Sequence, residues 1–122
     1  MVKSAAILFG IVFLAIGILG FVPAITKDEM LLGIFHVNML HNIVHLATGA
    51  VGLLCGMAGF GASRTYFRIF GIIYALVAVL GFYYGDQPLL GLIANNTADT
   101  WLHVVIAGVS LLLGFGTARQ TT

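Results

Sequence analysis

The chain has 122 residues, of which 61% are hydrophobic and only 7% are charged. A soluble domain carries about a quarter charged residues, so this composition excludes an ordinary soluble surface and predicts an exterior that faces the lipid bilayer. The net charge of +1 gives no electrostatic reason to expect nucleic acid as a partner, and the one cysteine excludes an internal disulfide. The length suits a single transmembrane domain over residues 1–122.

Charged residues divide the chain into apolar runs, each close to the roughly 20 residues that a membrane helix needs. These runs do not alternate apolar with polar residues, as the strands of a membrane β-barrel do. The sequence therefore predicts an all-α integral membrane four-helix bundle. Its runs lie between Lys3 and Lys27, between Glu29 and Arg64 with a core at residues 35–59, between Arg68 and Asp86, and between Asp99 and Arg119.

The charges also predict an orientation. One side of a four-span arrangement carries no acid and holds Lys3, Arg64, Arg68 and Arg119. The opposite side holds Lys27 together with Asp28, Glu29, Asp86 and Asp99. The positive-inside rule then places both termini in the cytoplasm of a multi-pass protein, which we expect in a bacterial inner membrane.

An internal repeat relates the two halves of the chain. Residues 9–21 align without gaps on residues 70–82, and the polar residues that follow align as well. We expect repeat 1 at about residues 5–60 and repeat 2 at about residues 66–117, each one a helical hairpin. Because each repeat has an even number of spans, a pseudo-twofold axis along the membrane normal relates them. The aligned polar pairs are Asn38 with Asn96, His41 with Asp99, and His45 with His103.

The polar pairs form the candidate site, near the outer face between the second and fourth helices. Residues four apart on a helix share a face, so His41 and His45 point the same way, as do Asp99 and His103. Three nitrogens and one carboxylate make a plausible ligand set for Zn, Fe, Cu or Mn.

Other residues near the four candidate ligands could have supporting roles at the site. Asn38, Asn42 and Asn96 are candidates for hydrogen bonds that orient the ring nitrogens. His36 lies on a different face from His41, so we treat it only as an additional candidate. Trp101 suits an aromatic belt at the end of a span, or stacking on a ring cofactor beside His103.

The same residues allow other interpretations. His45 and His103 could ligate a haem as a bis-imidazole pair, or one histidine could hold a chlorin. Asp99 lies three residues after Asn96, a spacing typical of a helix cap. The whole cluster could instead be a structural hydrogen-bond network between helices, or a path for protons or solutes.

Several motifs together resemble an uncharacterised bacterial family of small four-span membrane proteins, a domain of unknown function. The motifs are Gly20-Phe21, Leu32-Gly33-Ile-Phe-His-Val-Asn38, His41-Asn42-xx-His45-Leu, Phe70-Gly-Ile-Ile-Tyr74 and Asn96-xx-Asp99-xx-Leu102-His103. The resemblance runs from about Phe9 to Leu113. It implies the fold and the membrane location, but no activity.

The leading functional hypothesis is a binding site for a metal or a metal-containing cofactor. The alternative is an accessory subunit of a larger membrane complex, or a homo-oligomer, in which the cluster is structural or holds a peripheral pigment or haem. Short loops leave little for independent catalysis. An intramembrane metal-dependent hydrolase ranks last, because no general base is visible beyond the candidate ligands.

Overall fold

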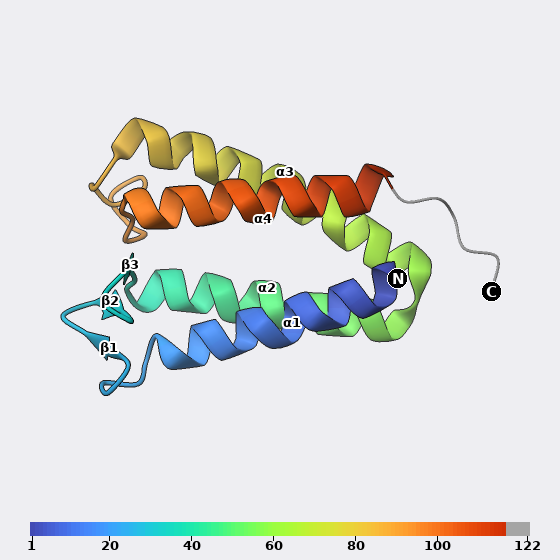
Figure 1. The fold of residues 1–122 in the computed structure, drawn as a ribbon, viewed down its shortest axis with the longest axis horizontal. Helices are drawn as coiled ribbons and strands as arrows, with labels where there is room; N and C mark the ends of the chain where they lie inside the picture. The colour runs from blue at the N-terminus through green and yellow to red at the C-terminus, as the bar shows by residue number, and fades with distance from the viewer. Residues whose placement is uncertain (117–122) are drawn as a thin grey trace.

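Four long helices make up most of the structure, a computed structural model that describes residues 1–116 (Figure 1). Each helix is long and apolar enough to cross a membrane. The chain is therefore a multi-pass membrane protein, and the predicted all-α bundle is confirmed. The helices are α1 (Val2–Leu19), α2 (Met39–Ala58), α3 (Phe60–Tyr84) and α4 (Thr97–Gly116).

The helices pair as two hairpins, α1 with α2 and α3 with α4. Figure 1 shows the first hairpin in blue to green and the second in yellow to red, with their long axes running together. Both interhelical loops lie at one end of the bundle, and the N-terminus lies near the other end with the turn between α2 and α3. This arrangement confirms the predicted tandem hairpins.

The loop of the first hairpin folds into a small antiparallel sheet of three strands in the order β1–β2–β3. The strands are β1 (Thr26–Lys27), β2 (Met30–Leu31) and β3 (Phe35–His36). The second helix therefore begins at Met39, and the predicted core starting at residue 35 was wrong at that end. Asn38 has extended backbone, and its side chain accepts a hydrogen bond from the backbone N–H of His41, which fixes the start of α2.

A single residue, Gly59, separates α2 from α3. Its φ is 132°, a value that residues other than glycine rarely adopt. Glycine therefore lets the chain reverse its direction at this one residue. Arg64 and Arg68 both lie inside α3, so this helix begins before the apolar run that was predicted between Arg68 and Asp86. Arg68 instead donates from Nε to the carbonyl of Gly114 at 2.7 Å, across the second hairpin. Arg119 and the predicted end of repeat 2 at residue 117 lie outside the described residues.

Glycines bring the helices of the first hairpin into close contact. A Cβ added to Gly10 would lie 2.8 Å from the carbonyl oxygen of Gly49, and a Cβ added to Gly49 would lie 2.8 Å from that of Gly10. Helices in lipid associate through this kind of backbone approach, because no hydrophobic force drives them together there.

The two loops hold each other through reciprocal hydrogen bonds. Asn38 donates from Nδ2 to the carbonyl of Leu92 at 3.0 Å, and Asn96 donates from Nδ2 to the carbonyl of Ile34 at 2.9 Å. The alignment that matches Asn38 with Asn96 also matches Ile34 with Leu92, so one contact occurs twice. We call these two bonds the loop clasp. They support the pseudo-twofold relation between the hairpins and place the first turns of α2 and α4 side by side.

Candidate metal centre

Three histidines meet at the centre of the bundle, a short way in from the loop clasp. His41 and His45 lie four residues apart on α2, and His103 comes from α4. Their ring centroids are 4.4 Å apart for His41 and His45, 5.7 Å for His41 and His103, and 6.3 Å for His45 and His103. All three side chains are buried, and one ligand atom from each lies within 4.8 Å of the others. The sequence predicted this convergence, and these residues are the three-histidine cluster.

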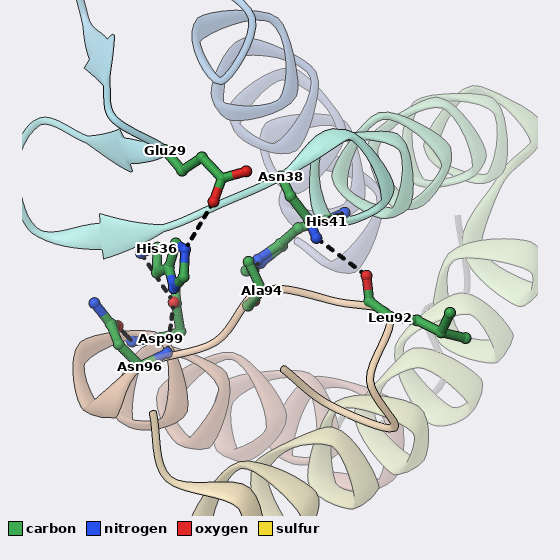
Figure 2. A network of polar contacts seen from close by, with 8 residues as sticks. All are labelled: Glu29, His36, Asn38, His41, Leu92, Ala94, Asn96 and Asp99. Atoms are coloured by element: carbon green, nitrogen blue, oxygen red, sulfur yellow. Dashed lines mark hydrogen bonds and ion pairs between the residues drawn. The ribbon is translucent and has the colours of Figure 1, made fainter. Parts of the chain in front are cut away.

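Hydrogen bonding defines the state of one ring in the cluster. His41 Nδ1 lies 2.8 Å from the carbonyl oxygen of Ala94, and because a carbonyl only accepts, Nδ1 carries the proton (Figure 2). In the neutral ring Nε2 then has a free lone pair. This Nε2 is buried and has no hydrogen-bond partner among the described residues. The same is true of three other atoms, which are also buried and have no hydrogen-bond partner among the described residues: both ring nitrogens of His45 and Nδ1 of His103.

Aromatic side chains pack on the outer faces of the cluster. Phe13 of α1 lies 5.6 Å from the His45 ring, and Tyr74 of α3 lies 5.4 Å from the His103 ring, centroid to centroid. The Tyr74 hydroxyl is 3.0 Å from the Thr48 Oγ1. Each helix therefore contributes to the site, since α1 and α3 supply the aromatic walls and α2 and α4 supply the imidazoles.

Asp99 occupies a different place from the one a fourth ligand would take. Its Oδ2 accepts from the backbone N–H of His36 and from that of Asn96, both at 3.0 Å, and its own N–H donates to Asn96 Oδ1 at 2.9 Å. This reciprocal pair with Asn96 is a capping box at the start of α4, as its spacing indicated. The structure does not bring the Asp99 carboxylate into the three-histidine cluster, because these backbone donors hold it at the helix end.

His41 and Asp99 make the same contact with opposite polarity. They are matched by the repeat, and so are the residues they bind, Ala94 and His36. The His41 ring donates to the carbonyl of Ala94, whereas the Asp99 carboxylate accepts from the N–H of His36, as Figure 2 shows. A donor in one half and an acceptor in the other therefore join each helix to the loop of the opposite hairpin.

Comparison with known proteins identifies the family of this chain. The family model described as a domain of unknown function (DUF4383) matches residues 3–116. The chain belongs to this family. No curated protein and no solved structure matches the chain. Membership of DUF4383 confirms the resemblance seen in the sequence, and the structure adds the arrangement of side chains that the family description leaves open.

The three asparagines that were predicted to orient the imidazoles contact other groups in this DUF4383 chain. Asn38 and Asn96 cap α2 and α4 and form the loop clasp. Asn42 is buried against Gly20, where no side chain would fit, and its Oδ1 has no partner among the described residues. None of the three amides hydrogen-bonds to an imidazole within residues 1–116.

The two additional candidates also lie outside the cluster. The His36 ring pairs with Glu29, with Nε2 3.2 Å from Oε1 in the loop (Figure 2). Trp101 is 56% exposed and packs edge-on against Phe82 at 5.3 Å, so it faces away from His103. An aromatic residue at the outer surface of a span suits the belt position that the sequence indicated.

Sequence reasoning missed three groups that shape the site. Phe13 and Tyr74 are matched by the repeat, and that match was a usable signal that both face equivalent places. The Ala94 carbonyl gave no signal, because every residue has a carbonyl and only the fold selects the one that meets His41.

Proposed function

We propose that the three-histidine cluster binds a transition-metal ion through Nε2 of His41 and one nitrogen each of His45 and His103. The observation that carries the proposal is the hydrogen bond from His41 Nδ1 to the Ala94 carbonyl. Histidines that ligate metals usually donate the other ring N–H to a carbonyl or carboxylate, which fixes the ring and frees the ligating lone pair. His41 has that arrangement, and its Nε2 is buried without a hydrogen-bond partner among the described residues.

The spacing of the three nitrogens suits a metal after a small adjustment. A tetrahedral ion with nitrogen ligands at 2.0–2.1 Å has neighbouring nitrogens about 3.4 Å apart. The ligand atoms here lie within 4.8 Å of one another, so modest rotations of the rings would close the set. Three protein ligands leave a fourth position open, as in sites where a metal takes a further small molecule.

The chemistry of the ligands narrows the metal. Imidazole suits Zn, Cu and Fe, whereas Mn prefers carboxylate and water, so a cluster of three imidazoles favours the first three metals. The buried positive charge of such an ion needs compensation in a low-dielectric setting. Asp99 lines the same cavity as His45, and its carboxylate would offset part of that charge without being a ligand.

Two alternatives fit the described geometry less well. A structural network would satisfy its buried polar atoms, yet four ring nitrogens of the cluster lack a partner among the described residues. A haem or chlorin inside the bundle would need room beside the rings. The cavities that reach the cluster have volumes of about 130 and 80 Å³, which are smaller than a tetrapyrrole.

We further propose that the cluster lies near the outer face of a bacterial cell membrane, with both chain termini in the cytoplasm. The support is the separation of basic and acidic residues in the sequence. The cluster lies toward the loop end of the bundle, where the acidic residues gather.

Metal analysis of the purified protein tests the proposal. We expect about one Zn, Cu or Fe per chain by elemental mass spectrometry, and loss of at least nine-tenths of it in the His45→Ala/His103→Ala double variant. His36→Ala is the matched control, because this histidine lies outside the cluster and should leave the metal content unchanged. A cobalt-loaded sample should show a visible absorption band that only the double variant loses. The absence of stoichiometric metal after growth with each of the three metals would overturn the proposal.

A further inference from the structure

A groove runs along the boundary between α1 and α4. Direct contact between these two helices is slight compared with the packing inside each hairpin. Two cavities of about 180 and 130 Å³ lie along this boundary, and Ile16 and Leu102 line both of them. We call the two cavities together the α1–α4 groove. Leu8 and Val12 line its larger part and are 60% and 44% exposed, so the groove opens on the apolar surface that faces lipid.

The inner end of the groove has two polar residues in a wall that is otherwise apolar. His45 and Asp99 line the cavity of about 130 Å³, whereas the larger cavity is lined only by apolar side chains. His45 is 3% exposed, and neither of its ring nitrogens has a partner among the described residues. A neutral imidazole offers one donor and one acceptor, so the ring of a residue that lines this cavity holds unused hydrogen-bonding groups.

The repeat provides an internal comparison for this groove. A cavity of about 80 Å³ lies between α2 and α3, and every residue that lines it except His45 is the repeat match of a residue that lines the α1–α4 groove. Two matches differ in polarity, since Tyr74 stands for Phe13 and Thr48 stands for Ile106. Tyr74 and Thr48 hydrogen-bond to each other at 3.0 Å. The α2–α3 cavity is thus lined by a polar pair that the α1–α4 groove lacks, and it is smaller than either cavity of the groove.

We propose that the α1–α4 groove binds a neutral lipid of the quinone class, with the ring in the inner cavity beside His45 and the hydrocarbon tail along α1 and α4. An apolar cavity of about 150 Å³ holds one benzene ring, so the inner cavity of about 130 Å³ suits one six-membered ring. Phe35 and the His45 ring line this inner cavity and supply aromatic contacts. A ring oxygen would accept from the His45 N–H.

Charge and size select this class over other membrane molecules. A fatty acid would bring a second carboxyl group against Asp99, and two neighbouring carboxyl groups in a low-dielectric cavity cannot both ionise without a large electrostatic cost. A phospholipid head group is far larger than the inner cavity. A cationic amine would lose its hydration among apolar side chains, while two backbone N–H groups already donate to the Asp99 carboxyl group.

The inference goes beyond metal binding and stands without it. If one nitrogen of His45 binds a metal, the N–H of the other remains available to a ring oxygen. The proposal concerns binding only, and no electron transfer is part of it.

Binding of a decyl-substituted benzoquinone to the full chain in lipid nanodiscs tests the inference. We expect saturable binding above that of empty nanodiscs, with methyl NMR shifts at Ile16 and Leu102 and smaller shifts at their repeat matches Val77 and Val44. Ile16→Phe should weaken binding at least tenfold by filling the groove. Val77→Phe is the matched control, because it fills the α2–α3 cavity instead and should bind as the unaltered chain does.

The outcomes separate this inference from the metal proposal. Elemental analysis of the same samples should find unchanged metal in Ile16→Phe. Loss of quinone binding with metal retained in that variant supports the groove, and a metal-free chain that still binds quinone overturns only the proposed function. Binding no greater than in empty nanodiscs, or equal loss in Ile16→Phe and Val77→Phe, would overturn the groove assignment. Decanoic acid binding as tightly as the quinone would overturn the choice of a neutral ring.

Discussion

At the scale of single residues, Asp99 has the most instructive environment. It is buried at the first turn of α4, and its carboxylate receives two backbone N–H groups rather than facing the imidazoles. Anionic acceptors at a helix N-terminus are favourable because the backbone donors there are otherwise unpaired. The residue therefore joins the start of α4 to the first hairpin's loop, and it also lines the cavity beside His45.

Replacing Asp99 separates a capping role from a ligating role. Asp99→Asn keeps an acceptor oxygen but removes the charge, so we expect a loss of roughly 1 kcal/mol in the free energy of unfolding. Metal content should stay at the level of the unaltered chain, because the three-histidine cluster is intact. Thermal unfolding in detergent and elemental analysis measure the two effects. Loss of metal with unchanged stability would show instead that Asp99 is a ligand.

The sequence predicted the site at this scale only in part, for physical reasons. Spacing by four placed His41 beside His45, and the repeat supplied His103. The spacing that matches Asp99 to His41 also makes a helix cap, and only the position of the His36 N–H decides between the two roles. Asn42 shows the same limit, because its surroundings depend on how closely Gly20 lets the helices approach.

At the scale of elements, the contact between α1 and α2 depends on glycines that meet backbone to backbone. Gly49→Ala would place a methyl group 2.7 Å from the backbone N of Leu14 and 2.8 Å from the carbonyl of Gly10. Neither neighbour can move without shifting a helix. We expect a loss of about 1–3 kcal/mol in the free energy of unfolding, as for other overpacked sites.

Gly108→Ala is the matched control on α4. Its added methyl group would meet no neighbouring atom within 4 Å, so stability should be unchanged or slightly higher. Thermal unfolding of both variants in one detergent gives the comparison. Equal losses at the two positions would show that the close helix contact is not what Gly49 provides.

The helices themselves were predictable, but their ends were not. Apolar length gave the spans, since lipid requires helices of about that size. Phe35 of β3 continued the apolar pattern of the second span, although it pairs with Leu31 in a loop sheet. Arg64 and Arg68 marked the limits of two predicted apolar runs, whereas Gly59 alone makes the turn and α3 already begins at Phe60.

At the scale of the whole molecule, the loop clasp holds the two hairpins together at the end opposite Gly59. Asn38 and Asn96 each combine two roles, since the side-chain oxygen caps a helix and the side-chain nitrogen reaches the opposite loop. The sequence predicted that these residues are equivalent. Their partners are backbone carbonyls in the other half, which no residue pattern marks.

Asn38→Asp and Asn96→Asp separate the two roles. Aspartate caps a helix as well as asparagine does, but it cannot donate to the opposite carbonyl. We expect each substitution to lower the free energy of unfolding by about 0.5–1 kcal/mol. The two losses should be similar, because the same contact occurs in both halves. Thermal unfolding measures the cost. Asn38→Ala, which also removes the cap, should cost more, and equal stability of Asn38→Ala and Asn38→Asp would contradict the assignment.

The opposite polarity of the hydrogen bonds made by His41 and Asp99 indicates what gene duplication and fusion can add to such a molecule. Two separate copies of one hairpin would assemble as a homodimer and would carry the same side chain at this position in both subunits. Fusion into one chain frees each copy to change alone, so one half can keep an imidazole that donates to Ala94 while the other adopts a carboxylate that accepts from His36. A duplicated and fused hairpin can thus enclose an asymmetric centre, with an odd number of histidines, that no symmetric pair of subunits could build.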